Sequence, residues 1–140
     1  MRTVFADAVY WIAIVRPKDP WREAAQRARE RLGPTRIVTT DEVLGEFLAA
    51  LSKSGPTLRS KAVEMVQAIL SNANVRVVPQ SRDSFLKGMA LYGARGDKEY
   101  SLQDCISMNV MKSESIGEVL TKDHHFEQEG FTILMTRGES

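Results

Sequence analysis

Hydrophobic positions along the chain form short apolar runs, separated by longer stretches in which apolar residues recur every three or four positions. The short runs are bounded by polar or turn-forming residues, which is typical of buried strands. The longer stretches are typical of helices that bury one face. The pattern predicts five strands, at residues 3–6, 36–39, 74–79, 117–121 and 131–135, and seven helices, at residues 7–15, 20–32, 39–51, 57–70, 81–94, 101–112 and 123–130.

Capping and turn residues support these boundaries. Asp19-Pro20 is a helix start, Gly33-Pro34 a helix stop, and Thr39 with Glu42 matches a capping box. Because the strands are separated by helices, their connections are crossovers, which produce a parallel sheet covered by helices on both faces. The expected architecture is therefore a three-layer α/β fold.

Composition supports one globular domain over residues 1–140. Nine glycines and five prolines are too few for a low-complexity chain, and the single cysteine, Cys105, excludes an internal disulfide and fits a reducing compartment. The net charge of +1 indicates no particular class of binding partner. The apolar run Ala8–Val15 is far shorter than the roughly 20 residues of a membrane span, so a soluble cytoplasmic protein is expected.

Acidic residues stand where the predicted strands and helices meet. In an open α/β sheet, ligands bind beyond the carboxyl ends of the strands. Asp7 follows the first strand, Glu46 lies in the helix after the second, Asp104 begins the helix at 101–112 and Asp123 follows the fourth strand. Carboxylates from four separate segments can therefore converge on one rim of the sheet.

Each of these residues also has a purely structural interpretation. Asp104 stands three residues after Ser101 in a capping pattern, Asp123 can cap the short helix that follows, and Glu46 lies off the apolar stripe of its helix. Asp7 is harder to explain in this way, because an ionised carboxylate between apolar segments is costly unless it is paired or bound to a cation. A cluster of carboxylates favours a hard divalent cation, Mg²⁺ or Mn²⁺, which is suited to hydrolysing a phosphodiester.

Four motifs in order resemble those of the PIN domain family and its VapC-like ribonucleases. They are Val4–Asp7, Thr39–Glu46, Tyr100–Ser107 and Leu120–Phe126. The resemblance spans nearly the whole chain and implies a central parallel sheet in the strand order 3-2-1-4-5. It also implies a metal-dependent endoribonuclease that leaves a 5′-phosphate and a 3′-hydroxyl. The family's acidic positions map onto Asp7, Glu46, Asp104 and Asp123, which would be both catalytic residues and ligands of one or two Mg²⁺ or Mn²⁺ ions.

The resemblance further implies a homodimer, an RNA substrate and a co-encoded antitoxin. No membrane partner is expected, because the apolar run Ala8–Val15 is too short to span a membrane. Two positions depart from the family pattern. Ala8 stands where relatives often carry a hydroxyl after the first Asp, and Lys122 stands where many carry Thr before the last Asp. Lys122 could contact phosphate, compete with the metal or point to solvent.

Other polar residues suggest weaker functional interpretations. Lys53, Arg59 and Lys61 flank the turn at 54–56 with no acid nearby, and are the candidate contacts to the RNA backbone. Adjacent His124 and His125 cannot face one point on a helix, so a structural or positioning role is expected rather than a ligand role.

Several further residues are expected to serve packing. Gly45 could admit the close approach of a neighbouring helix or of the substrate, and a neighbouring helix is expected. Trp11 and Tyr10 are expected to pack in the core, and four methionines to fill it: Met65, Met89, Met108 and Met111.

Other classes fit less well. A haloacid-dehalogenase-type phosphatase needs a second Asp where Val9 stands, and a receiver domain needs an Asp after the third strand, where Pro79 stands. No phosphate-binding loop or nucleophile elbow occurs. The alternative that stays open is a catalytically weak or inactive PIN-like protein that binds RNA or a protein partner.

Overall fold

A five-stranded parallel sheet lies at the centre of the computed structural model, which describes residues 1–137. Residues 138–140, which the predicted domain includes, lie outside the described residues. The strand order is β3-β2-β1-β4-β5, as the family resemblance implies. The strands are β1 (Arg2–Ala6), β2 (Thr35–Thr40), β3 (Val75–Val78), β4 (Glu118–Leu120) and β5 (Thr132–Ile133).

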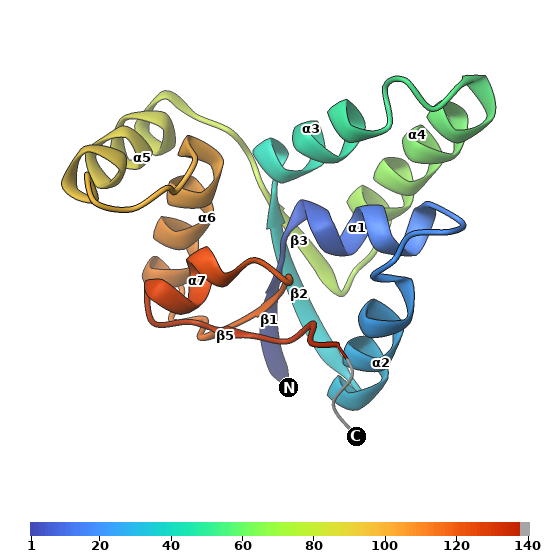
Figure 1. The fold of residues 1–140 in the computed structure, drawn as a ribbon, viewed down its shortest axis with the longest axis horizontal. Helices are drawn as coiled ribbons and strands as arrows, with labels where there is room; N and C mark the ends of the chain where they lie inside the picture. The colour runs from blue at the N-terminus through green and yellow to red at the C-terminus, as the bar shows by residue number, and fades with distance from the viewer. Residues whose placement is uncertain (138–140) are drawn as a thin grey trace.

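Helices cover both sides of this sheet, which confirms the predicted three-layer α/β architecture. In Figure 1, α1, α2 and α4 lie to one side of β1 and β2, α5, α6 and α7 lie to the other, and α3 lies above. The helices are α1 (Ala8–Val15), α2 (Arg22–Leu32), α3 (Asp41–Ala50), α4 (Pro56–Ser71), α5 (Arg82–Ala94), α6 (Leu102–Ser113) and α7 (His124–Gln128). None of these helices, all within residues 1–137, has the length and hydropathy of a membrane span.

The apolar core is centred on the middle strand. Val4, Phe5 and Ala6 of β1 are fully buried, and Phe47 of α3 and Phe126 of α7 are fully buried in the same apolar cluster. A central strand of a parallel sheet is covered on both faces, so it consists of consecutive apolar residues rather than alternating ones. Asp7, the polar residue that follows this strand, therefore lies at the edge of the apolar interior.

Two predicted helix starts, at residues 20 and 39, lie two residues before the observed ones. Thr40, not Thr39, caps α3, with its hydroxyl accepting the N–H of Val43 at 3.0 Å. The α2 helix begins at Arg22 rather than at residue 20, because the Asp19 carboxylate accepts the N–H of Trp21 at 2.8 Å and holds a turn there.

Three packing predictions are wrong or partly wrong. A Cβ on Gly45 would meet nothing within 4 Å, so this glycine admits no helix. The close approach is at Gly88 instead, where a Cβ would lie 2.6 Å from Ile106. Met89 is 52% exposed and Met65 only partly buried, whereas Met108 and Met111 are buried as predicted.

Strand register sets which chain segments meet at the carboxyl edge. Ala6 pairs with Leu120 on β4, so the residues that follow them, Asp7 and Thr121, lie next to each other. On the other side, Phe5 pairs with Val38 of β2, two residues before the start of α3 at Thr40. The carboxyl ends of β1, β2 and β4 therefore lie next to one another at one edge of the sheet.

Candidate active site

Asp7 is the most buried acidic group at this edge, with 7% of its surface exposed. It stands before the first turn of α1, yet its side chain makes no capping hydrogen bond. Its Oδ2 instead accepts a hydrogen bond from the hydroxyl of Thr121 at 2.9 Å. Burial raises the pKa of Asp7 to about 7, the Thr121 hydrogen bond opposes this rise, and the charge of Glu46 adds to it.

Thr121 joins two of the acidic residues and was not identified from the sequence. It is fully buried, and its hydroxyl also accepts the N–H of Asp123 at 3.2 Å. Thr121 thereby connects the end of β1 to the start of α7 through one hydroxyl. The available signal was a polar residue at the end of an apolar strand, two positions before Asp123.

Asp104 and Asp123 each serve as helix caps and also face the site. Asp104 Oδ2 accepts the N–H of Ser101 at 3.0 Å, which completes a capping box at the start of α6. Asp123 Oδ1 accepts the N–H of His125 at 2.9 Å and caps α7. The structural interpretation from sequence is therefore correct for both. Since each cap uses one oxygen of its carboxylate, the second oxygen remains for a ligand.

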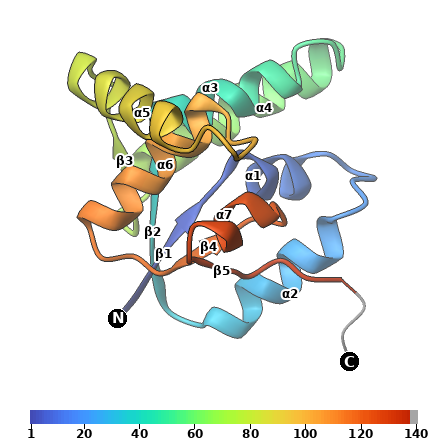
Figure 2. The same ribbon diagram turned by 60° about the vertical axis from the view of Figure 1, so that its left-hand side comes forward.

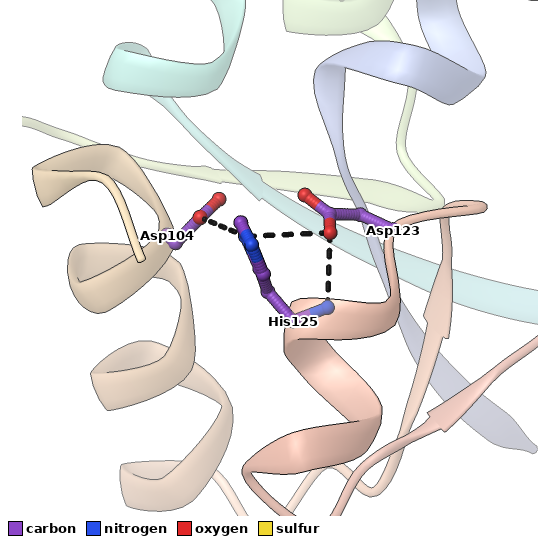
Figure 3. A group of neighbouring side chains, drawn as sticks. All are labelled: Asp104, Asp123 and His125. Carbon is purple, nitrogen blue, oxygen red and sulfur yellow. Dashed lines mark hydrogen bonds and ion pairs between the residues drawn. The ribbon is translucent and has the colours of Figure 1, made fainter. Parts of the chain in front are cut away.

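His125 stands between these two carboxylates (Figure 3). Its Nδ1 lies 3.0 Å from Asp104 Oδ2 and 3.4 Å from Asp123 Oδ1. Among the described residues, no other basic side chain lies within ion-pair distance of the Asp104 or the Asp123 carboxylate.

Glu46 completes the acidic group from α3. Partial burial raises its pKa, and repulsion by Asp104 and Asp123 raises it further. Asp7 is in turn affected by the charges of Glu46 and Asp104. Each of the four predicted carboxylates thus lies within electrostatic range of at least two of the others. No lysine or arginine of residues 1–137 forms an ion pair with any of them.

This donor set fits a divalent cation. Oxygen ligands suit Mg²⁺ and Mn²⁺, and a cation would relieve both the mutual repulsion and the cost of burying Asp7. Donor atoms of Asp104, Asp123 and His125 lie within 4.8 Å of one another, a spacing that allows all three to bind one ion.

The predicted basic contacts are not at this cluster. Lys53, Arg59 and Lys61 are exposed around the turn between α3 and α4, at the end of α3 away from Asp41, and the Arg59 guanidinium donates to the Ser52 carbonyl at 2.8 Å. The Lys122 ammonium lies 5.5 Å from the centre of the Trp21 ring, and none of the ion pairs among residues 1–137 joins it to the acidic cluster.

A second set of charged residues behind the site was also missed. Glu129, whose side chain is 6% exposed, accepts hydrogen bonds from Arg95, Tyr100 and Lys112. The Tyr100 ring in turn lies against the His125 imidazole, with centroids 5.6 Å apart. No local pattern connects residues 95, 100, 112 and 129, because only the packing of α6 against α7 brings them together.

Comparison with known proteins bears on the family and the fold. Residues 4–131 match the PIN domain family. The structure resembles that of VapC20 from Mycobacterium tuberculosis, a sarcin-ricin loop cleaving toxin, with a TM-score of 0.81 and 26% identity over 92% of this chain and 96% of that one. A search of curated proteins finds no match.

Two more distant structures share the fold alone. VapBC2 from Rickettsia felis, bound to a DNA fragment from its promoter, gives a TM-score of 0.67 at 12% identity, and FitAcB from Neisseria gonorrhoeae gives 0.62 at 14%. Both alignments cover 94% of this chain and 96% of the other. With the match over residues 4–131 and the observed strand order, the chain belongs to the PIN domain family and has the fold of VapC toxins.

Proposed function

We propose that this protein is a VapC-like endoribonuclease that hydrolyses RNA phosphodiester bonds with the help of Mg²⁺ or Mn²⁺. The observation that carries the proposal is the meeting of four carboxylates from four chain segments with no lysine or arginine of residues 1–137 paired to them. A fold that gathers negative charge without neutralising it is prepared for a cation.

The proposed metal ligands are Asp7, Glu46, Asp104 and Asp123. When bound there, a divalent cation supplies Lewis-acid activation of water and stabilisation of charge on the leaving oxygen. Thr121 fixes one oxygen of Asp7, and the caps at α6 and α7 fix one oxygen each of Asp104 and Asp123. Three of the four ligands are thus oriented before the ion arrives, which limits the reorganisation that binding requires.

The proposed reaction consumes one water for each bond cut. The water oxygen bonds to phosphorus, the bond from phosphorus to the 3′-oxygen breaks, and the 3′-oxygen takes up a proton. The products are a 5′-phosphate and a 3′-hydroxyl. Lys53, Arg59 and Lys61 would hold the RNA backbone at a distance from the cut, because their turn lies away from the acidic cluster.

The proposed partners are RNA, an antitoxin and a second copy of the chain, in the cytoplasm. Toxin–antitoxin complexes among the structural neighbours support an antitoxin. Exposed apolar residues on one helix, α5, support association of the chain with itself: Phe85, Leu86, Met89 and Tyr92. The buried free thiol of Cys105 is compatible with a reducing compartment.

The decisive experiment is cleavage of labelled RNA by purified protein with Mg²⁺, with Mn²⁺ and with chelator. Wild type should cut only with metal, and Asp7→Asn should lose nearly all activity because an amide is a poor ligand for a hard cation. Asp41→Asn is the matched control. Asp41 lies at the end of the neighbouring strand, but its carboxylate accepts the N–H of Gln80 at 2.9 Å, which an amide oxygen can replace.

The same experiment tests the alternative function, an RNA-binding or protein-binding PIN domain without catalysis. Wild type that binds the RNA but leaves it intact with both ions would favour that alternative. Cleavage that persists in Asp7→Asn would show that the acidic cluster is not the site, or that a contaminating nuclease is being measured.

A further inference from the structure

The imidazole of His125 occupies the space between two of the proposed metal ligands. Asp104 comes from the start of α6 and Asp123 from the residue before α7, and the ring points between their carboxylates (Figure 3). One donor atom from each of these three residues lies within 4.8 Å of the other two. The site therefore offers a nitrogen donor beside its oxygens.

The ring is held in this position from both sides. The backbone N–H of His125 donates to Asp123, which fixes the first turn of α7. The Tyr100 ring lies against the imidazole, and the Tyr100 hydroxyl donates to Glu129 at 2.9 Å. His125 itself keeps 28% of its side chain exposed, so the site is open to an ion from solvent.

His124 provides an internal comparison. It is the only other histidine of the chain, it is the adjacent residue, and its side chain is 77% exposed and paired with Glu127. Neighbouring residues on a helix point in different directions, so only one of the two imidazoles can reach the carboxylates.

We propose that His125 is a ligand of the same metal as Asp104 and Asp123, and that it makes the site select Mn²⁺ over Mg²⁺. This rests on the proposed metal-dependent function. Imidazole is a good ligand for transition-metal ions, whereas Mg²⁺ binds oxygen and water. The nitrogen thus favours Mn²⁺, whereas carboxylate oxygens alone suit both ions.

The direct test is pulsed electron paramagnetic resonance of Mn²⁺ bound to the full chain, without RNA. A coordinated imidazole adds a nitrogen hyperfine coupling to the Mn²⁺ signal. The coupling should be present in wild type and in His124→Ala, where His125 is the only histidine left, and lost in His125→Ala. Its absence from wild type would refute the proposal, whether or not the His125 variant folds.

Binding titrations give the second readout. His125→Ala should weaken Mn²⁺ binding about 10–100-fold, the range seen when a group supporting a metal site is removed, and should change Mg²⁺ binding far less. His124→Ala should match wild type for both ions. Unchanged or tighter Mn²⁺ binding by His125→Ala would show instead that the imidazole competes with the ion for the carboxylates.

These outcomes separate the ligand proposal from the proposed function. Wild type that binds Mn²⁺ through oxygen alone and still cuts RNA would overturn the role of His125 and leave the nuclease in place. Wild type that binds neither ion would overturn both.

Discussion

Asp7 is a carboxylate that the folded protein holds most easily in its protonated form. Burial raises its pKa to about 7, against about 3.9 in an unfolded chain. Between these values the folded state binds more protons than the unfolded state, so this group's contribution to stability is present below pH 4 and is lost as pH rises toward 7.

We therefore expect metal-free wild type to become less stable as pH rises from about 4 to 7, by at most about 4 kcal/mol from this residue. Asp7→Asn removes the titrating group and should flatten this slope. Thermal melts in chelator across this pH range measure how the stability of each protein changes with pH. Equal slopes for the two proteins would show that Asp7 does not titrate with a raised pKa. Mg²⁺ or Mn²⁺ should stabilise wild type by mass action and the variant far less.

Asp123 separates a capping role from a site role. Asn caps a helix about as well as Asp, so Asp123→Asn should keep the hydrogen bond to His125 and retain full stability without metal. It should nevertheless abolish RNA cleavage and the stabilisation by Mg²⁺. Asp123→Ala, which also removes the cap, should in addition lose about 1 kcal/mol of stability. If Asp123→Asn cuts RNA and responds to Mg²⁺ like wild type, Asp123 is only a cap.

Of the candidate site residues, the charged ones are easier to find in the sequence than those that hold them in place. Asp7, Asp104 and Asp123 stand at a strand end or in the first turn of a helix, where position along the chain already indicates position in space, whereas Glu46 lies in the second turn of α3. Thr121 acts across β1 and β4, so its role depends on a register that periodicity does not contain. Met89 and Gly45 have helical spacing but lie at exposed positions, because the pattern of a short helix does not show which of its faces is covered.

Glu129, which follows α7, holds the end of that helix to α6 and to the segment that joins α5 and α6. Figure 2 shows α5 and α6 as a pair of adjacent helices. Arg95 and Tyr100 come from the segment between them, Lys112 from the last turn of α6, and all three donate to Glu129. Because Asp104 begins α6 and Asp123 precedes α7, this contact sets the separation of two site carboxylates.

We expect Glu129→Gln to lose roughly 1–3 kcal/mol of stability, since charge-assisted hydrogen bonds at a largely buried carboxylate are weakened together. The Arg95 hydrogen bond lowers the pKa of Glu129 to about 2. Its stabilisation is therefore present above about pH 4.5 and is lost as pH falls toward 2, so the difference between variant and wild type should shrink in acid.

Glu118→Gln is the control for this measurement. Glu118 also forms a two-point contact, with Arg2, but that pair is solvent-exposed and should contribute less than about 1 kcal/mol. Urea or thermal unfolding at pH 7 and pH 3 compares the two variants. Equal losses would mean that Glu129 has no special role.

The elements themselves were largely predictable, and their arrangement was not. Apolar runs identified all five strands, since buried parallel strands lack alternation and stand out as blocks. The order β3-β2-β1-β4-β5 could be predicted only from the family resemblance. The spacing of apolar residues indicates which face of an element is buried, but not which strand lies next to it. The shift at α2 arose from Asp19, whose side chain holds a turn instead of a helix start.

The exposed apolar face of α5 predicts that two copies of the whole molecule associate. Phe85, Met89 and Tyr92 recur at helical spacing and are 40%, 52% and 55% exposed. We expect a dimer in solution that Met89→Glu converts to monomer without loss of fold, measured by light scattering. Leu70→Glu is the control, because Leu70 is 59% exposed on α4 and should leave the dimer intact. Monomeric wild type at micromolar concentration would contradict the prediction.

The position of Asp123 along the chain has a consequence for synthesis. Thr121, which holds the Asp7 carboxylate, and Asp123 leave a ribosome more than a hundred residues after Asp7. A growing chain therefore cannot assemble the acidic cluster until β4 has emerged and paired with β1. If the protein cuts RNA, the nascent polypeptide is harmless to the ribosome that makes it and to its own message until Asp123 has emerged.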